Sequence, residues 1–295
     1  MRNCYKRTDV FRCSNPTHAK FDKKVSVYHV LKVRNCYPNG CVYFLWRCQK
    51  LNKGEACPRG YQHVGRKCFG CKFFYDEKVN NQLEVALQDG SMEQFWTELQ
   101  EFEDWLQEVQ GRTFSIFGEV KSVKPRFKKQ IIGDKSWLKL QGFLLVFDEC
   151  YIGNTHFEDH AFVIVSTRLH KRLQFAPGDR LEFQAVVQED RGRIVFEHLR
   201  RIEFERKNSQ GIWTESEARV ALATATEFPQ QPESCFYCEH GALVDVFAST
   251  ADGEQHYRHL YCLKSIADPH YCYVRALETL TDDGCPPEST MSIST

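Results

Sequence analysis

Short runs of alternating apolar and polar residues recur along the chain, and this alternation predicts β-strands that are buried on one face. In the first 80 residues two such runs lie at 25–33 and 41–48, with turn signals at Pro38-Asn39-Gly40 and Pro58-Arg59-Gly60. Strands of this length bury little apolar surface by themselves. We therefore expect a small domain at residues 1–80 that depends on bound metal for its stability.

Between Met92 and Gln110 the apolar spacing changes to that of an amphipathic α-helix. Apolar residues recur at intervals of four and three positions, at Phe95, Leu99, Phe102, Leu106 and Val109. Acidic residues occupy the other faces, so residues 81–111 are predicted to be an acidic linker helix packed by its apolar stripe onto a neighbouring domain. A partner-binding or self-associating helix is the alternative, because two heptads are too few to establish a coiled coil.

Residues 112–207 show strand patterns throughout. Five strands are predicted, at 113–123, 137–147, 161–166, 180–187 and 193–204, and five strands in a segment of this length fit a small closed barrel. The segment resembles an OB-fold: Phe117-Gly118-Glu119-Val120 lies in the first strand, and a run from Phe175 to Phe183 with Pro177-Gly178-Asp179 leads into the fourth. Another small barrel would share this pattern.

The predicted fold class is mainly β with α. It consists of a five-stranded OB-like barrel flanked by two small metal-stabilised cysteine-rich modules, with an amphipathic helix as a link. The C-terminal module is expected at 208–278, with a linker rich in Pro, Gln and Ser at 228–234, and residues 279–295 are expected to form a disordered tail.

The chain has 295 residues, of which 42% are hydrophobic and 14 are cysteine. Its N-terminus leads into no apolar signal region, and its longest apolar runs fall far short of the roughly 20 residues that span a bilayer. We therefore expect no membrane association and an intracellular location, cytoplasmic or, in a eukaryote, nuclear. Abundant cysteine without a secretion signal favours metal ligation over disulfides.

The net charge of zero conceals a segregation of charge along the chain. Residues 1–80 carry 17 Lys and Arg against 5 Asp and Glu, whereas residues 81–111 carry 8 acids and no Lys or Arg. In the basic block, cations adjoin aromatic residues, as at Trp46-Arg47, which is the usual composition of a surface for single strands or RNA. The alternative is that the aromatics form a small core and the cations keep it soluble.

The tightest metal motif is Cys235-x2-Cys238-x20-His259-x2-Cys262, which resembles treble-clef and LIM-type zinc knuckles. Four protein ligands would leave no open position, so such a zinc ion would be structural. His256 and Cys272 are the alternates if His259 or Cys262 does not serve.

The eight N-terminal cysteines divide into two sets of four. One partition places Cys48, Cys57, Cys68 and Cys71 around one ion and Cys4, Cys13, Cys36 and Cys41 around another. Interleaved ligation and unmetallated buried cysteine remain open. Zinc is favoured, and an iron–sulfur cluster is the alternative, since it also takes four thiolates.

Cationic and aromatic residues in the barrel segment define a candidate nucleic-acid site. They comprise a predicted loop after the first strand and two positions on the second strand: Lys124, Arg126, Phe127, Lys128, Lys129, Trp137 and Lys139. The resemblance to OB-folds implies that oligonucleotides bind there. A barrel used purely for protein contacts is the alternative.

No enzyme class receives positive support. The segment from His156 to His160 matches neither metalloprotease motif, because Asp159 stands where Glu is required, and no dinucleotide or nucleophile motif is present. The predicted function is binding of nucleic acid, single-stranded DNA or RNA, by a protein with structural zinc and a potential protein partner at the acidic helix. A zinc-stabilised protein-interaction scaffold and an iron–sulfur redox protein are the alternatives.

Overall fold

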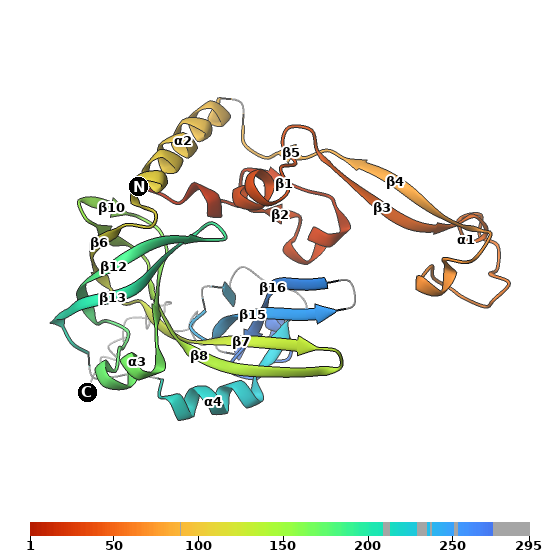
Figure 1. The fold of residues 1–295 in the computed structure, drawn as a ribbon. Helices are drawn as coiled ribbons and strands as arrows, with labels where there is room; N and C mark the ends of the chain where they lie inside the picture. Colours follow the sequence, from red (N-terminus) through yellow and green to blue (C-terminus); the bar gives the residue numbers. More distant parts are fainter. Residues whose placement is uncertain (89, 209–212, 229–234, 237, 251–252, 274–295) are drawn as a thin grey trace, which may run out of the picture. The chain divides into compact units, whose positions relative to one another are not determined.

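The computed structural model describes residues 1–88, 90–208, 213–228, 235–236, 238–250 and 253–273 (Figure 1). The predicted tail and most of the predicted linker at 228–234 lie outside the described residues. The structure is mainly β with a few helices, as predicted. It divides into two compact units: Met1–Val123 with Leu144–Ile212, and Lys124–Phe143 with Trp213–Thr295. Among the described residues, no helix combines the length and the apolarity needed to cross a membrane.

The first unit begins with short elements: η1 (Cys4–Lys6), β1 (Phe11–Arg12), η2 (Pro16–Phe21), β2 (Lys24–Val25) and η3 (His29–Val33). Strand β1 pairs with β2 and with β5 (Glu84–Val85). The predicted strand at 25–33 is therefore wrong beyond Val25, because η3 is a π-helical turn. Its first N–H, that of His29, donates to the Ser26 hydroxyl at 3.3 Å, a local bond that competes with strand pairing.

A separate two-stranded antiparallel sheet follows. Strands β3 (Cys41–Cys48) and β4 (Phe74–Asn81) pair from Cys41 opposite Asn81 to Cys48 opposite Phe74, which confirms the predicted strand at 41–48. The loop between them carries α1 (Gln49–Asn52) and η4 (Arg66–Cys68). Because an isolated two-stranded sheet is marginally stable in water, interactions at its ends must support it. We call residues 41–81 the ribbon module.

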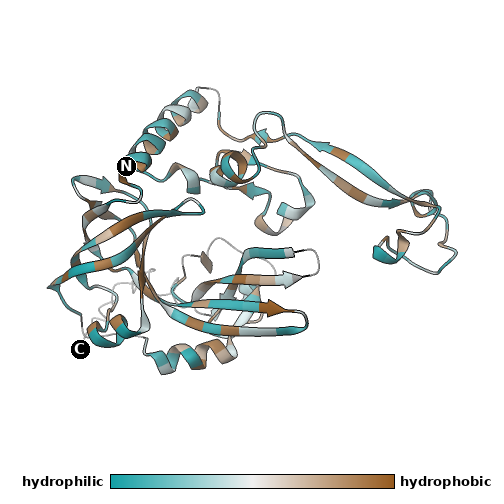
Figure 2. Ribbon diagram, in the orientation of Figure 1, coloured by the Kyte–Doolittle hydropathy of each residue, from teal (hydrophilic) through white to brown (hydrophobic). Residues whose placement is uncertain are grey.

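Helix α2 (Ser91–Val109) confirms the predicted amphipathic helix. All five residues of its apolar stripe are buried, and so is Trp105. Figure 2 shows apolar and polar positions interleaved along its length. Phe102 packs edge-to-face on Tyr5 with ring centroids 5.1 Å apart, and Tyr5 donates a hydrogen bond to Glu103. The stripe therefore attaches the helix to the N-terminal segment.

All five strands predicted in 112–207 are present in some form. The first unit contains β6 (Thr113–Glu119), β9 (Cys150–Ile152), β10 (Thr155–Phe157), β11 (Ala161–Val165), β12 (Arg180–Asp190) and β13 (Arg193–Arg206), with α3 (Thr167–Leu173) between β11 and β12. The strand order is β10-β9-β6-β12-β13-β11, in which β11 and β13 are parallel. This order is open, and no closed barrel is formed among the described residues.

The second unit contains most of the hairpin of β7 (Ser122–Ile132) and β8 (Lys135–Phe147), whose ends at Ser122–Val123 and Leu144–Phe147 belong to the first unit. It also contains α4 (Glu215–Thr224), β14 (Thr226–Phe228), β15 (Gly241–Thr250), β16 (Gly253–Cys262) and η5 (Pro269–Tyr271). The predicted cationic loop at 124–129 is wrong, because these residues lie within β7. Lys128 pairs with Asp245 in a parallel ladder with β15, a partner distant in sequence that local pattern does not reveal.

Candidate metal centres and nucleic-acid interface

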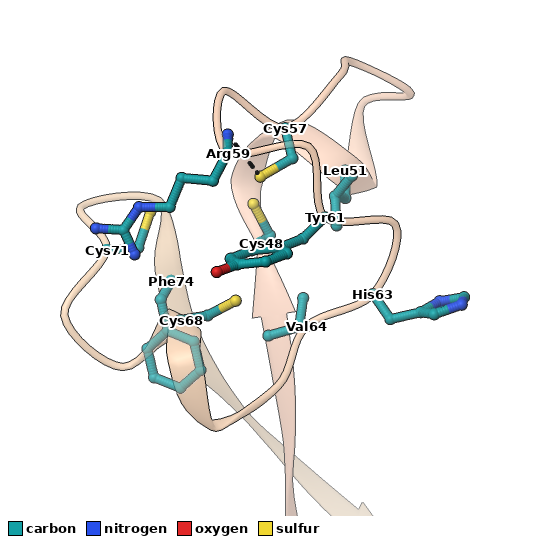
Figure 3. Close-up of a pocket in the computed structure, with 10 residues that line it drawn as sticks. All are labelled: Cys48, Leu51, Cys57, Arg59, Tyr61, His63, Val64, Cys68, Cys71 and Phe74. Carbon is teal, nitrogen blue, oxygen red and sulfur yellow. Dashed lines mark hydrogen bonds between the residues drawn. The ribbon is translucent and has the colours of Figure 1, made fainter.

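The far end of the ribbon module brings four predicted ligands to one pocket. Cys48 ends β3, and Cys57, Cys68 and Cys71 come from the connecting loop; all four line a pocket of about 310 Å³ that includes open solvent. In Figure 3 the side chains of Cys48 and Cys57 point toward each other, and the Cys68 side chain points inward from the opposite loop. The predicted set is therefore gathered at one place by the pairing of β3 with β4.

The turn after Cys57 favours the thiolate form of that residue. The N–H of Arg59 donates to the Cys57 sulfur at 3.4 Å, and this bond, together with one from the N–H of Tyr61, lowers the pKa of Cys57 below its ordinary value. A thiolate is the form of cysteine that binds metal. The sequence signal for this geometry is Pro58-Arg59-Gly60, in which Gly60 has a φ of 72°.

The other end of the ribbon module carries a second group of cysteines. Burial and then the neighbouring thiols of Cys41 and Cys13 raise the pKa of Cys36. The Asn81 amide, opposite Cys41 in the ladder, lies 3.3 Å from the sulfur of Cys13 and 3.7 Å from that of Cys41. Three members of the second predicted set thus lie close to one another.

Cys4, the fourth member of that set, has different surroundings. Burial and the carboxylate of Glu98 on α2 raise its pKa to about 11. After burial, the groups with the largest effect on this pKa are charged side chains and not thiols. Cys150, which was assigned to no metal set, is buried, and burial raises its pKa to about 12.

The C-terminal cysteines line a pocket of about 380 Å³ that includes open solvent. Cys235, Cys238 and Cys262, three of the four predicted ligands, line it, and the fourth cysteine that lines it is Cys272, directly after η5. His259 does not line this pocket; its Nδ1 contacts the Glu227 carboxylate. The alternate His256 stacks on the Phe247 ring, with centroids 4.1 Å apart, and likewise does not line it.

Two predicted nucleic-acid contacts on β7 are buried. Lys124 is only 6% exposed, and its ammonium donates to the carbonyls of Phe236, Cys238 and Gly241 at 3.1, 2.6 and 3.3 Å. Phe127 is 1% exposed and belongs to the core. In this arrangement Lys124 fixes the loop that carries Cys235 and Cys238 and presents no charge to phosphate.

The remaining cations of β7 interact with partners in the same unit. Arg126 lies 3.9 Å from an Asp245 oxygen, and the Lys128 ammonium lies 3.9 Å from the centroid of the Phe247 ring. Lys129 donates to Glu227 at 3.1 Å and to the Tyr261 hydroxyl at 2.9 Å. On β8, by contrast, Trp137 and Lys139 are exposed.

The sequence pointed to only part of an exposed aromatic face on the ribbon module: it named Trp46 beside Arg47, but not Val42, Phe44 or Phe69. Val42, Phe44 and Trp46 alternate along β3 and are 53%, 60% and 44% exposed. Phe69 packs edge-to-face on Trp46, with centroids 4.8 Å apart, and is itself 53% exposed. The sequence signal for this face was the alternation within 41–48. An alternating pattern shows that a strand has two faces, but it does not show which face other segments cover.

The chemistry of the cysteine sets fits zinc or another thiophilic ion, since soft thiolates select such metals. Across the described ranges, no three or more Cys, His, Asp or Glu side chains are placed closely enough to hold an ion. The described cysteines are thiols, with no disulfide assigned. Comparison of the chain with protein-family models, with curated proteins and with solved structures found no match.

Proposed function

We propose that the protein binds single-stranded nucleic acid, DNA or RNA, through the ribbon module, and that cysteine-bound zinc holds this module in shape. The observation that carries the proposal is the exposed face of β3, where Phe44 and Trp46 are exposed at alternate positions and Phe69 packs on Trp46. Exposed rings at alternate strand positions suit unpaired bases, and stacking contributes about 1–3 kcal/mol per base.

The charge around these rings favours a polyanion. The ribbon module has six exposed cations that form no ion pair in the described part of the chain: Lys53, Arg59, Arg66, Lys67, Lys72 and Lys78. Lys78 lies directly opposite Phe44 in the ladder. Arg47 and Lys50, by contrast, are paired with Glu77 and Glu55. Cations beside accessible rings can neutralise the backbone while bases stack.

The proposed zinc has a structural role in this function. The two-stranded sheet has a cluster of cysteines at each end. Four thiolates on one ion would fix the loop between β3 and β4. Such an ion would have no open coordination position, so it would position the rings and would not act in chemistry.

We also propose that the strands of residues 113–206 are related to an OB-fold. The parallel pair β11 and β13, the helix α3 between β11 and β12, and the pairing of β12 with both β6 and β13 support this connectivity. If so, Trp137 and Lys139 on β8 provide a second surface of the kind that OB-folds use.

A matched pair of tryptophan variants tests the ribbon assignment. Trp46 and Trp137 are similarly exposed, at 44% and 50%, so Trp46→Ser and Trp137→Ser remove comparable side chains from different strands. The titration measures anisotropy of fluorescein-labelled oligo(dT) and oligo(rU) with the zinc-loaded chain at low salt. Trp46→Ser should weaken binding about 5- to 100-fold, as loss of one stacking platform implies, and Trp137→Ser should have a smaller effect.

The same titration tests the charge argument. Asp76 lies opposite Trp46 in the ladder, so Asp76→Asn should tighten binding, and Lys72→Glu should weaken it and flatten its salt dependence. Binding that is absent at low salt in the zinc-loaded chain would refute the proposed function. Binding lost in Trp137→Ser but kept in Trp46→Ser would move the interface to β8, and a brown preparation would indicate an iron–sulfur cluster in place of zinc.

A further inference from the structure

We infer that Cys235, Cys238, Cys262 and Cys272 form a second structural metal centre, a four-thiolate site for zinc, from which His259 is excluded. This inference goes beyond the proposed function, because the site belongs to the second unit and contributes nothing to the ribbon module. All four residues line one pocket of about 380 Å³ and come from three separate segments.

Different structural elements place the four cysteines at the pocket. Cys235 and Cys238 lie on a tight loop that ends at Gly241, where a Cβ would lie 1.8 Å from the Cys235 carbonyl oxygen, so glycine is required. Cys262 ends β16 directly opposite Gly241. The turn of η5, capped by the Asp268 carboxylate accepting from the His270 N–H, then leads into Cys272.

Strand geometry removes His259 from the ligand set. Side chains three positions apart on a strand point to opposite faces, so His259 and Cys262 of β16 cannot share one. The neighbouring strand β14 agrees with this division: Phe228 lies opposite Leu260 and packs with Cys262, whereas Glu227 lies opposite Tyr261 and contacts His259. The spacing of His259 and Cys262 is that of a ligand pair on a turn, but both residues lie on strand β16, where this spacing separates their side chains.

The surroundings of the pocket suit an anionic centre. Zinc with four thiolates carries two net negative charges, and the buried Lys124 ammonium is bound to three carbonyls of the loop that holds Cys235 and Cys238. Lys264 also lines the pocket. An apolar cluster of Phe228, Leu260 and Ile266 includes Cys235 and Cys262, and Cys272 packs against it.

The test compares Cys272→Ser with His259→Ala in the full chain. Both are expressed with zinc, exchanged into a mild chelator and measured for zinc by elemental analysis. Relative to the parent, Cys272→Ser should lose roughly one equivalent of zinc per chain, and His259→Ala should retain the full content. Cys272→His is the rescue variant, because imidazole also binds zinc; it should restore the lost equivalent and so separate loss of a ligand from misfolding.

Two outcomes would overturn the inference: loss of zinc in His259→Ala, or retention of the full zinc content in Cys272→Ser. Failure of Cys272→His to restore zinc would also overturn it. The same proteins are then titrated with labelled oligo(dT). Because the proposed nucleic-acid surface lies in the ribbon module, Cys272→Ser should bind the oligonucleotide as the parent does, so this inference and the proposed function can fail independently.

Discussion

The imidazole of His29 is held in an environment that favours its neutral form. Burial, helped by the neighbouring His18 and Arg34, lowers its pKa from 6.5 to about 4. The rings of His18 and His29 meet edge-to-face with centroids 4.9 Å apart, and the Nε2 of His29 is buried without a hydrogen-bond partner among the described residues. Protonation of His29 would place a positive charge beside His18 and Arg34, both of which disfavour that charge.

This environment predicts a loss of stability in mild acid. Above pH 6.5 His29 is neutral in both folded and unfolded chains and has no effect on stability. As the pH falls from 6.5 towards 4, His29 is protonated in the unfolded chain before it is protonated in the folded chain. The free energy of unfolding should therefore fall by about 1–2 kcal/mol, which is less than the full pKa difference implies because the side chain is partly exposed to solvent. Urea unfolding at a series of pH values measures this, and His29→Phe should flatten the profile over that window. An equal slope in both proteins would contradict the prediction.

At the scale of the element, helix α2 depends on its apolar stripe and much less on its charges. Phe102 is fully buried against Tyr5 and Trp105, whereas several of the acids are exposed. The ion pairs Arg7–Glu98 and Lys32–Glu103 offset part of the negative charge of the helix, at 3.3 and 3.0 Å. These are partly exposed pairs, which contribute little individually.

The corresponding prediction is a large difference between two substitutions on the same helix. Phe102→Ala removes a buried ring and should lower the free energy of unfolding by about 3–5 kcal/mol, because a cavity remains where the ring packed. Gln107→Ala, at an exposed position, should change it by less than about 0.5 kcal/mol. Chemical denaturation followed by tryptophan fluorescence measures both. Similar effects at the two positions would show that the stripe does not anchor the helix.

At the scale of the whole molecule, hydrophobic burial and the proposed metal stabilise different parts of the chain. The sheet of β6, β12 and β13 has a core of fully buried residues, among them Phe183, Phe196 and Ile116. The ribbon module has no comparable core; its exposed residues include Val42, Phe44 and Trp46. Under the proposed function, metal therefore stabilises the ribbon module, and hydrophobic burial stabilises the sheet.

Removal of metal should accordingly affect the molecule locally. After extraction of zinc with a strong chelator, the amides of β3 and β4 should lose protection in hydrogen exchange, while those of β12 and β13 should keep it. Mass-spectrometric exchange before and after chelation measures the difference, with β12 and β13 as the internal control. Unchanged protection in β3 and β4 would show that the cysteines of the ribbon module do not stabilise it through metal.

The sequence by itself determined the elements whose signal is local. The stripe from Phe95 to Val109 specified α2, and the alternation at 41–48 specified β3, because both periodicities are complete within one segment. The proximity of Cys235 to Cys238 was equally local, since two residues three positions apart in the sequence stay close together in any fold. The predicted closed barrel is not formed among the described residues, whereas a relation to OB-folds, bound zinc and binding of nucleic acid remain predictions.

Only the tertiary structure decided how distant segments combine. Lys124 has the same sequence features as a phosphate-binding lysine, but the loop at 236–241 supplies three carbonyls that bind it. His259 has the spacing of a ligand, but β14 places Glu227 beside it and leaves Cys272 to line the pocket. The periodicity of a segment determines which of its residues share a face. Burial and charge partners depend on the neighbouring segments that cover each face, and those segments lie far away in the chain.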